Sequence, residues 1–517
     1  MAHNKSLMLI LLILSCLATP FFLHNFFLHK WLHAKSLTPS SCKSHLSDSW
    51  YPTQKDTLLS LLDSLDAQAK QRFSADISSK NIRAIIVPHA SYYFSGDVAA
   101  AAYRLMPSSI RRVILIAPSH NTAFSGITLP TCTTYQLPIG SIPIDTQALN
   151  QLAKNPLFTY NNSAYLEEHS LEIQLPMLYY YLPKATIVPL MVGTLSVDEL
   201  YEIAQTLVTL IDNTTVIIVS SDFTHYGPRF KYEPFADNQQ LRIKQLDSGA
   251  IQAIQKTSVH QYISYIERTG ATICGRMPIA ILMALLEKNL FGPIETHLLA
   301  YKTSSKQTDT AADSVSYTSL VFSTKKNISP TPKELLTDYE KSELLTVARS
   351  ALENIFTHKT PEQLLYPILT NANTTPCGAF VTLYKHGVLR GCIGRTVSDE
   401  PLYKTIIAMT KAAAQEDSRF KPVTHDELTD ITISISVLTQ PKNVTSYHDI
   451  SIGTHGIILK NGSHSAVFLP KVATEFKWDL PTTLSELSIK AGLPSDAWQN
   501  KDTLYSVFES IDFTEKK

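Results

Sequence analysis

The sequence of 517 residues has few cysteines and no excess of charge of either sign. Its 45 basic and 45 acidic residues balance, and because no basic stripe stands out, nucleic acid is not indicated as a partner. The six cysteines are widely scattered, without the Cys-x-x-Cys spacing that is typical of zinc and iron–sulfur sites. The sequence therefore predicts no dense disulfide framework, and we expect any functional cysteine to act alone.

Apolar residues are abundant: they make up 44% of the chain, which is ample for sizeable cores and excludes a wholly disordered protein. An apolar run extends from Leu7 to about Leu23, after Lys5. This run is long enough to cross a bilayer, which takes roughly 17 to 25 residues, and it also fits the apolar part of a signal peptide. Residues 1–35 are therefore expected to be a signal peptide or a membrane anchor, and the protein to be exported or anchored. For an anchor, Lys30, Lys35 and Lys43 outnumber Lys5, which favours a main body on the cytoplasmic side; cleavage by signal peptidase would reverse this.

Short apolar strands alternate with helical segments between residues 81 and 325. The strand-like segments "RAIIV", "RRVILIAP", "ATIVPLMV" and "TTVIIVSS" are separated by helical ones such as "GDVAAAAYRLM" and "VDELYEIAQTLVTLI". This alternation predicts βαβ units and an α/β domain with a largely parallel central sheet. Residues 36–80 precede it as a tether and a leading helix.

The order of elements changes after a polar, proline-containing stretch near residue 325, which indicates a domain boundary. A helix is followed by the hairpin-like "GAFVTLYKHGVLRGCIG", with its turn at Lys385-His386-Gly387. A second hairpin is expected to turn at Asn461-Gly462. Residues 326–517 are therefore predicted to form an α+β domain with a mainly antiparallel sheet.

Histidines follow three strands of the first domain, at the point where each strand ends. His89 comes after "IIVP", His120 after "ILIAPS", and Asp222 and His225 after "VIIVSS". Because ligands of parallel α/β sheets bind at the carboxyl ends of the strands, we expect these side chains to share one rim. Two imidazoles and a carboxylate suit a non-haem Fe(II) site, and imidazoles also suit copper and zinc. The alternative is a set of hydrogen-bonded loop residues.

Two further segments carry candidate residues. In "LEEHSLEIQLP", His169 and Glu172 are three residues apart and would share one helical face; the alternative is a solvated face with His169 as a cap. Cys274 stands just before an apolar helix, beside Arg276. A thiolate at this place would have a lowered pKa and could bind a metal; the alternative is an inert buried cysteine.

These motifs resemble the Memo (mediator of cell motility) family, whose fold is similar to that of the class III extradiol dioxygenases. The resemblance rests on "PHASYYFSG", "APSHNTAFSGI", "EEHSLEIQLP", "SSDFTHYG" and "ICGRMPIA" in this order. It implies one iron or copper ion, Fe(II) first and zinc last, with His89, His120 and Cys274 as ligands. Asp222 and His225 would line the same pocket, with His169, as acid–base residues acting on an unknown small-molecule or peptide substrate.

The C-terminal half resembles the AMMECR domain (named for the AMME chromosomal region). The segments that carry this resemblance are "LRGCIGR", "DSRFKPVTHDEL", "ISISVL", "GTHGIIL" and "AVFLPKVATEFKWDLPTTLSELSIKAGLPSDAW". In prokaryotes, this domain occurs with a Memo-like protein and a radical SAM protein as a linked set. The resemblance implies a separate radical SAM partner, because this chain lacks that enzyme's Cys-x-x-x-Cys-x-x-Cys motif.

A second candidate site lies in "LRGCIGR", where Arg390 and Arg395 flank Cys392 and could hold a thiolate or an anionic substrate. The alternative is a cysteine packed in a sheet.

Three functions follow from these candidates. The first is a metal-dependent redox enzyme, dioxygenase-like. The second is a scaffold protein that binds a metal or a peptide without turnover, and the third is a metal-free hydrolase with Cys392 as nucleophile.

Overall fold

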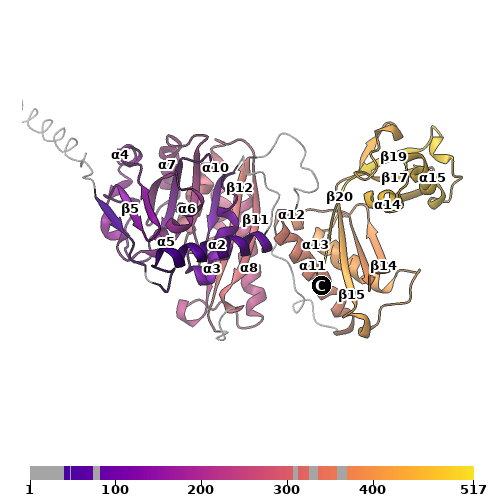
Figure 1. Ribbon diagram of the computed structural model, residues 1–517, viewed down its shortest axis with the longest axis horizontal. Coiled ribbons are helices and arrows are strands. Elements are labelled where there is room, and N and C mark those ends of the chain that lie inside the picture. The colour runs from indigo at the N-terminus through magenta and orange to yellow at the C-terminus, as the bar shows by residue number, and fades with distance from the viewer. Residues whose placement is uncertain are drawn as a thin grey trace, which may run out of the picture.

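The computed structural model has two domains, which occupy the two halves of Figure 1. It describes residues 40–46, 48–73, 82–306, 312–324, 336–357 and 370–516. The predicted signal peptide or anchor, residues 1–35, lies outside this range, as does most of the predicted boundary segment. Among the described residues, no helix has the length and apolar character needed to cross a bilayer.

A nine-stranded, mostly parallel sheet forms the centre of the N-terminal domain, which confirms the predicted fold class. Its order is β10-β12-β2-β9-β3-β8-β4-β7, and β11 pairs with β12. The four central strands are parallel and almost fully buried on both faces, which explains their continuous apolar runs. They are β2 (Ile82–Val87), β9 (Thr215–Ser220), β3 (Arg112–Pro118) and β8 (Thr186–Val192). The others are β4 (Ile127–Leu129), β7 (Phe158–Tyr160), β10 (His225–Tyr226), β11 (Ile294–Thr303) and β12 (Ser314–Thr324).

Helices cover this sheet where the sequence predicts them. The alanine-rich α3 (Tyr92–Tyr103) packs on β2, β11 and β12, and its small side chains allow a close approach. The apolar α10 (Arg276–Glu287) packs on β3 and β9, and against α7 (Val197–Val208). The predicted leading helix is α2 (Lys55–Arg72), which packs on α3. The other helices are α4 (Thr146–Leu152), α5 (His169–Glu172), α6 (Gln174–Tyr181), α8 (Gln239–Gln255) and α9 (Val259–Thr269).

A small three-stranded sheet ties the start of the described chain to this domain. It consists of β1 (Ser41–Lys43), β5 (Thr134–Leu137) and β6 (Gly140–Pro143). A disulfide joins Cys42 to Cys132 across a sequence separation of 90 residues. The expectation that functional cysteines act alone is therefore wrong for this pair. No spacing rule could find it, because the two cysteines meet only after β1 pairs with β5.

The C-terminal domain contains two four-stranded antiparallel sheets, as predicted for its α+β class. The first, β14-β13-β15-β20, is covered by α11 (Asp338–Thr357) and α13 (Leu402–Gln415). The second, β16-β19-β17-β18, packs with α14 (Pro470–Glu475) and α15 (Leu480–Lys490). The strands of the first sheet are β13 (Ala379–Lys385), β14 (Val388–Arg395), β15 (Ile431–Leu438) and β20 (Ser510–Thr514). Those of the second are β16 (Lys442–Val444), β17 (Gly456–Asn461), β18 (His464–Phe468) and β19 (Leu504–Phe508).

Both predicted hairpins are present. His386 and Gly387 have φ angles of 50° and 79°, the left-handed values that a two-residue turn of this kind requires. In the second hairpin Asn461 pairs with His464, so the turn consists of Gly462 and Ser463, one residue later than predicted.

Candidate metal centre

The order of strands in the N-terminal sheet brings two of the predicted histidines together. β9 lies between β2 and β3, and all three strands are parallel. Their carboxyl ends therefore meet at one rim. His89 stands two residues beyond β2 and His120 two residues beyond β3, so both imidazoles reach the space above β9. The rim predicted from the sequence is therefore present.

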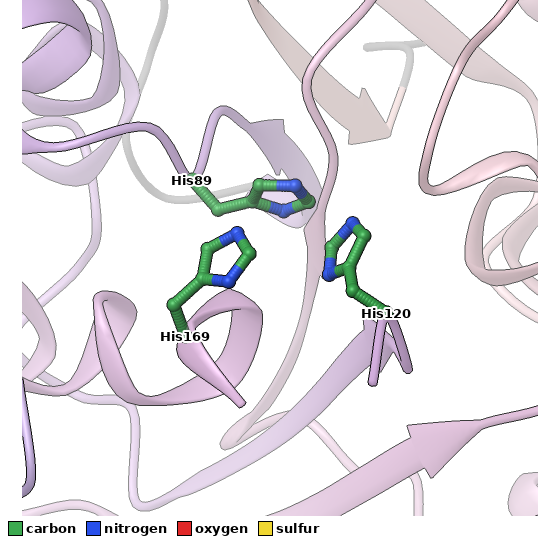
Figure 2. Close-up of side chains that lie close together, drawn as sticks. All are labelled: His89, His120 and His169. Carbon is green, nitrogen blue, oxygen red and sulfur yellow. The ribbon is translucent and has the colours of Figure 1, made fainter. Parts of the chain in front are cut away.

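A third imidazole joins them from α5. Figure 2 shows the rings of His89, His120 and His169 facing one another. Ring centroids lie 5.1 Å apart for His89 and His120, 5.4 Å for His89 and His169, and 4.7 Å for His120 and His169. One ligand atom from each ring lies within 4.8 Å of the other two. Three nitrogens at this spacing can bind one metal ion, and we refer to these residues as the histidine cluster.

Hydrogen bonds fix the orientation of the His89 ring. Its Nδ1 lies 3.0 Å from the Ser220 hydroxyl, which donates its own proton to the Ser170 carbonyl at 2.6 Å. The Ser220 oxygen must therefore accept from Nδ1–H of His89. This tautomer leaves the lone pair of Nε2 free, as a metal ligand requires.

Glu168 does the same for His120. Its carboxylate accepts from the His120 backbone N–H at 2.5 Å and from Nδ1 at 2.9 Å. It also accepts from the Ser170 N–H and so caps α5. Burial opposes ionisation, but the hydrogen bonds from His120 outweigh it and lower the pKa of Glu168 to about 2. A carboxylate behind a histidine is a recurrent partner of metal-binding imidazoles.

Burial keeps two rings of the cluster, those of His89 and His169, neutral. It is the main cause that lowers the pKa of His89 well below its ordinary value, and the neighbouring His120 and His169 add to it. Burial, followed by the charge of His120, also lowers the pKa of His169 to about 4. Since both rings are neutral at pH 7, their lone pairs are available without the loss of a proton.

Cys274 lies against this cluster. Its Sγ is 3.0 Å from Nε2 of His89, on the side where an ion bound to that nitrogen would lie. Burial, with the charge of Asp222 as second cause, raises the pKa of the thiol well above its ordinary value. The lowered pKa expected from the helix terminus and Arg276 is therefore wrong. The cysteine precedes α10 as predicted, but the effect of burial on the pKa of its thiol exceeds that of the helix terminus.

A cavity of about 660 Å³ opens beside the cluster. Its walls combine polar and apolar groups, among them His120, His225, Phe230, Ile266, Cys274 and Arg276. A small molecule bound there would meet His120 of the histidine cluster, Cys274 and Arg276 in the cavity wall. The arrangement joins candidate metal ligands to a space of substrate size.

Comparison with known proteins identifies the family. Residues 43–321, more than half of the chain, match the family described as Memo-like protein. The chain belongs to this family. Protein MEMO1 of Xenopus laevis is 34% identical over 286 residues, which cover 52% of this chain and 93% of that protein. Protein MEMO1 of Homo sapiens is 32% identical with the same coverage, and a MEMO1 family protein of Thermococcus onnurineus is 30% identical over 297 residues, or 54% and 97%. Residues 345–513 match AMMECR1. Both resemblances are confirmed.

The other predicted residues of the Memo-like domain have distinct surroundings. Asp222 accepts hydrogen bonds from the backbone N–H groups of His89, at 2.7 Å, and Ala90, at 3.3 Å. It therefore holds the loop that carries His89, and burial raises its pKa. His225 places Nδ1 near the carbonyls of Phe223 and Thr272, at 2.9 and 3.1 Å. Its other nitrogen is free of those bonds, and the residue lines the cavity.

Glu168 and Glu172 are not a solvated face, the alternative suggested by the sequence, because only 2% and 3% of their surfaces are exposed. Glu172 accepts from Ser44 and from the backbone N–H groups of His45 and Leu46. It thereby anchors the segment that follows the disulfide. Trp50 of that segment packs on the His169 ring, with centroids 4.6 Å apart. The partnership of Glu168 with His120 was missed because 48 residues separate them.

The predicted arginine partners of Cys392 in the AMMECR1 domain lie elsewhere. Arg390 pairs with Glu427 through two hydrogen bonds, at 3.0 and 2.9 Å. Arg395 is half-exposed and 4.0 Å from Glu400. The guanidinium that reaches Cys392 belongs instead to Arg419, which donates to its carbonyl at 3.2 Å. Arg390 and Arg395 thus lie next to carboxylates, and Arg419 is the arginine that contacts Cys392.

Proposed function

We propose that the Memo-like domain is a metal-dependent redox enzyme and that its ion is Fe(II). The observation that carries the proposal is the convergence of three imidazole nitrogens within 4.8 Å, two of them with hydrogen-bond partners that free the Nε2 lone pair. Imidazole donors suit iron and copper, and three of them leave coordination positions open for a catalytic role. Copper is the second choice of metal, and zinc the third.

His89, His120 and His169 are the proposed ligands. Family resemblance favours Cys274 in place of His169, and the short distance from its sulfur to His89 keeps it in reach of the same ion. Both sets share His89 and His120. Variants of the third ligand therefore distinguish the two sets, whereas a variant of His120 tests whether the site exists.

The surrounding residues support a reaction in the cavity. Bound Fe(II) would supply open positions for oxygen and for a substrate. His225, whose Nδ1–H is engaged by carbonyl groups, would present the lone pair of Nε2 as a proton acceptor. The substrate class is a small molecule, because the cavity holds about 660 Å³.

The test is metal content and affinity of the full chain purified without oxygen. We expect about one Fe(II) per chain in the natural protein and only traces in His120→Ala. His297→Ala is the matched control. It removes a half-buried histidine of the same domain, on β11. The ring of His297 hydrogen-bonds the hydroxyl of Ser323, which lies beside the amino end of β2 and so away from the rim.

Comparison of His169→Ala with Cys274→Ser identifies the third ligand as the one whose loss weakens binding more. Oxygen uptake by the loaded protein then tests the redox activity. If the natural protein holds only traces of metal even after addition of Fe(II) or Cu(I), the enzyme proposal fails. The scaffold function would then take its place.

We also propose that the Memo-like domain works in an oxidising compartment, as export or anchoring of the chain outside the cytoplasm would allow. The Cys42–Cys132 disulfide supports this, since such bonds persist in oxidising compartments and are rare in the cytosol. Alkylation of free thiols in intact cells, followed by mass spectrometry, should leave both cysteines unlabelled. Quantitative labelling of both would refute this location.

A further inference from the structure

A buried carboxylate stands behind the loop that carries His225. Asp247, on α8, is fully buried, and among the described residues no cation forms an ion pair with it. Burial raises its pKa, although hydrogen bonds from Ser316, Thr224 and Tyr301 counteract this. A buried carboxylate without a cation costs free energy unless hydrogen bonds compensate for the loss of water. The partners of Asp247 therefore indicate what it holds in place.

One oxygen of this carboxylate holds the loop between β9 and β10. Oδ1 of Asp247 accepts a hydrogen bond from the Thr224 hydroxyl at 2.6 Å and one from the Thr224 N–H at 3.2 Å. Thr224 stands two residues after Asp222, which holds the backbone of His89, and directly before His225, which lines the cavity. A shift of Thr224 would therefore disturb both a proposed metal ligand and the proposed proton acceptor.

The other oxygen of the carboxylate binds β11. Oδ2 of Asp247 accepts from the Tyr301 hydroxyl at 2.7 Å, and Tyr301 belongs to β11. Helix α11 of the C-terminal domain lies beside α8 and β11 in Figure 1, and it packs on β11. Asp247 thus connects the two elements next to the C-terminal domain with the loop at the candidate metal centre.

Two polar contacts and one aromatic side chain fix the start of α11 to these elements. Glu343 of α11 forms an ion pair with Lys244, which lies one turn before the buried carboxylate on α8. The side chains of this pair are only 17% and 23% exposed, so water and salt screen it less than a surface pair. Thr337, directly before α11, donates its hydroxyl proton to the Leu298 carbonyl of β11 at 2.8 Å. Tyr339 packs against the hydrophobic core of the Memo-like domain.

We propose that Asp247 is a positioning residue of the metal centre and that the C-terminal domain keeps it in place through α8 and β11. The inference rests on the proposed function, because His89 and His225 have their roles only there. It goes beyond that function, since it makes the AMMECR1 domain part of the support of the histidine cluster. Docking of α11 fixes α8 and β11, these two elements fix the groups that meet at Asp247, and Asp247 fixes Thr224.

Other contacts of the same loop keep it folded when this support is weakened. The His225 N–H donates to the Thr272 hydroxyl at 2.9 Å. The Phe223 N–H donates to the Ser316 carbonyl at 2.8 Å, and the Ser316 N–H donates to the Thr224 carbonyl at 3.0 Å. Loss of the contact with Asp247 should therefore shift the loop without unfolding it, which makes the effect measurable in a folded protein.

The first measurement is hydrogen exchange in the full chain without metal. Mass spectrometry of peptides that cover residues 221–226 reports on the N–H groups of the loop. Thr337→Val and Glu343→Gln, combined, remove both polar contacts between the domains and should speed exchange of this segment about fivefold. Glu353→Gln is the matched control: it makes the same substitution on the same helix, at a carboxylate that forms no ion pair among the described residues. It should change nothing.

The second measurement is the affinity of the full chain for Co(II), used as the probe metal. Glu343→Gln, remote from the histidine cluster, should weaken Co(II) binding about fivefold, and so should Thr224→Val, which removes the hydroxyl that binds Asp247. The double variant distinguishes positioning from general loss of stability. If the domain contact acts through Asp247, Glu343→Gln should weaken binding less than twofold once Thr224→Val is present. Urea unfolding of each variant confirms that it is folded.

Three results would overturn the inference. They are unchanged exchange of residues 221–226 in the combined variant, equal effects of Glu353→Gln and Glu343→Gln, and effects of Thr224→Val and Glu343→Gln on Co(II) affinity that multiply. A natural protein that binds neither Co(II) nor Fe(II) would instead overturn the proposed function. Hydrogen exchange would still decide, in that protein, whether the domain contact holds the loop.

Discussion

The two candidate sites contain a cysteine each, and the comparison of their surroundings shows how depth decides chemistry. Cys274 lies beside neutral imidazoles, where burial raises the pKa of its thiol and favours a role as metal ligand or neighbour. Cys392 lies on the edge strand β14 and is partly exposed, and the Thr382 hydroxyl donates to its sulfur at 3.2 Å. The same residue type therefore has different surroundings, because one thiol is buried beside candidate metal ligands and the other is partly exposed on a sheet edge.

The contacts that hold the residues of the two sites in place differ as well. Buried carboxylates hold His89 and His120, and a disulfide fixes the N-terminal segment whose Trp50 packs on His169, whereas the Asp417–Arg419 ion pair lies beside Cys392. If this comparison is correct, substitutions in the Memo-like domain should reduce stability or metal affinity by a larger free energy than substitutions in the AMMECR1 domain reduce stability.

The largest effect is expected from the disulfide. Cys42→Ser should lower the free energy of unfolding of the Memo-like domain by about 3 kcal/mol, because the bond closes a long loop in the unfolded chain. Urea denaturation, followed by the fluorescence change of the Trp50 segment, measures this. Cys377→Ser, which removes a free cysteine, is the control. An unchanged midpoint in Cys42→Ser would show that β1 and Glu172 hold the segment unaided.

A smaller effect is expected from the carboxylate behind His120. Glu168→Gln should weaken metal binding about 10- to 100-fold, because the amide cannot hold the ring and its tautomer as the carboxylate does. Titration with Co(II), followed by its visible absorption, gives the affinity. Glu172→Gln replaces an equally buried carboxylate four residues away that binds the N-terminal segment instead. Equal losses in both variants would mean that general destabilisation, and not the His120 contact, is responsible.

The smallest effect is expected in the AMMECR1 domain. Arg390 is the main cause that lowers the pKa of Glu427 from 4.5 to about 2. Since the folded-state pKa is the lower one, this pair stabilises the domain fully above pH 4.5, and the contribution is lost as the pH falls towards 2. We expect it to be worth about 1 kcal/mol, because the pair lies near the surface.

Unfolding of the AMMECR1 domain at pH values on either side of this range tests the prediction. Arg390→Gln should reduce the part of the acid sensitivity that Glu427 causes, and Lys385 and Thr424, which also contact that carboxylate, should keep the remainder. Arg395→Gln, which lacks such a partner at bonding distance, should keep it. If unfolding of the natural protein and of both variants has the same pH dependence, the Arg390–Glu427 pair does not contribute to the acid sensitivity.

The sequence revealed features that depend on neighbouring residues and missed those that depend on tertiary contacts. His89 and His120 could be predicted because strand ends are visible as apolar runs followed by proline. His169 was a candidate, but its approach to the other two depends on the placement of α5. Arg419, which donates to the Cys392 carbonyl, lies 27 positions beyond it in the chain, so the sequence pointed only to the nearer Arg390 and Arg395. The Cys42–Cys132 pair was missed for the same reason.

The position of β9 has a consequence for biosynthesis. β2 and β3, which precede His89 and His120, are consecutive β-strands of the large sheet, yet β9, made about a hundred residues later, lies between them. Strands in a sheet are about 4.8 Å apart, so β2 and β3 stand at twice that spacing only once β9 has been inserted. A nascent chain that has left the ribosome as far as α6 therefore carries all three histidines and still has no site. Metal capture must wait for the strand that brings Ser220 to His89.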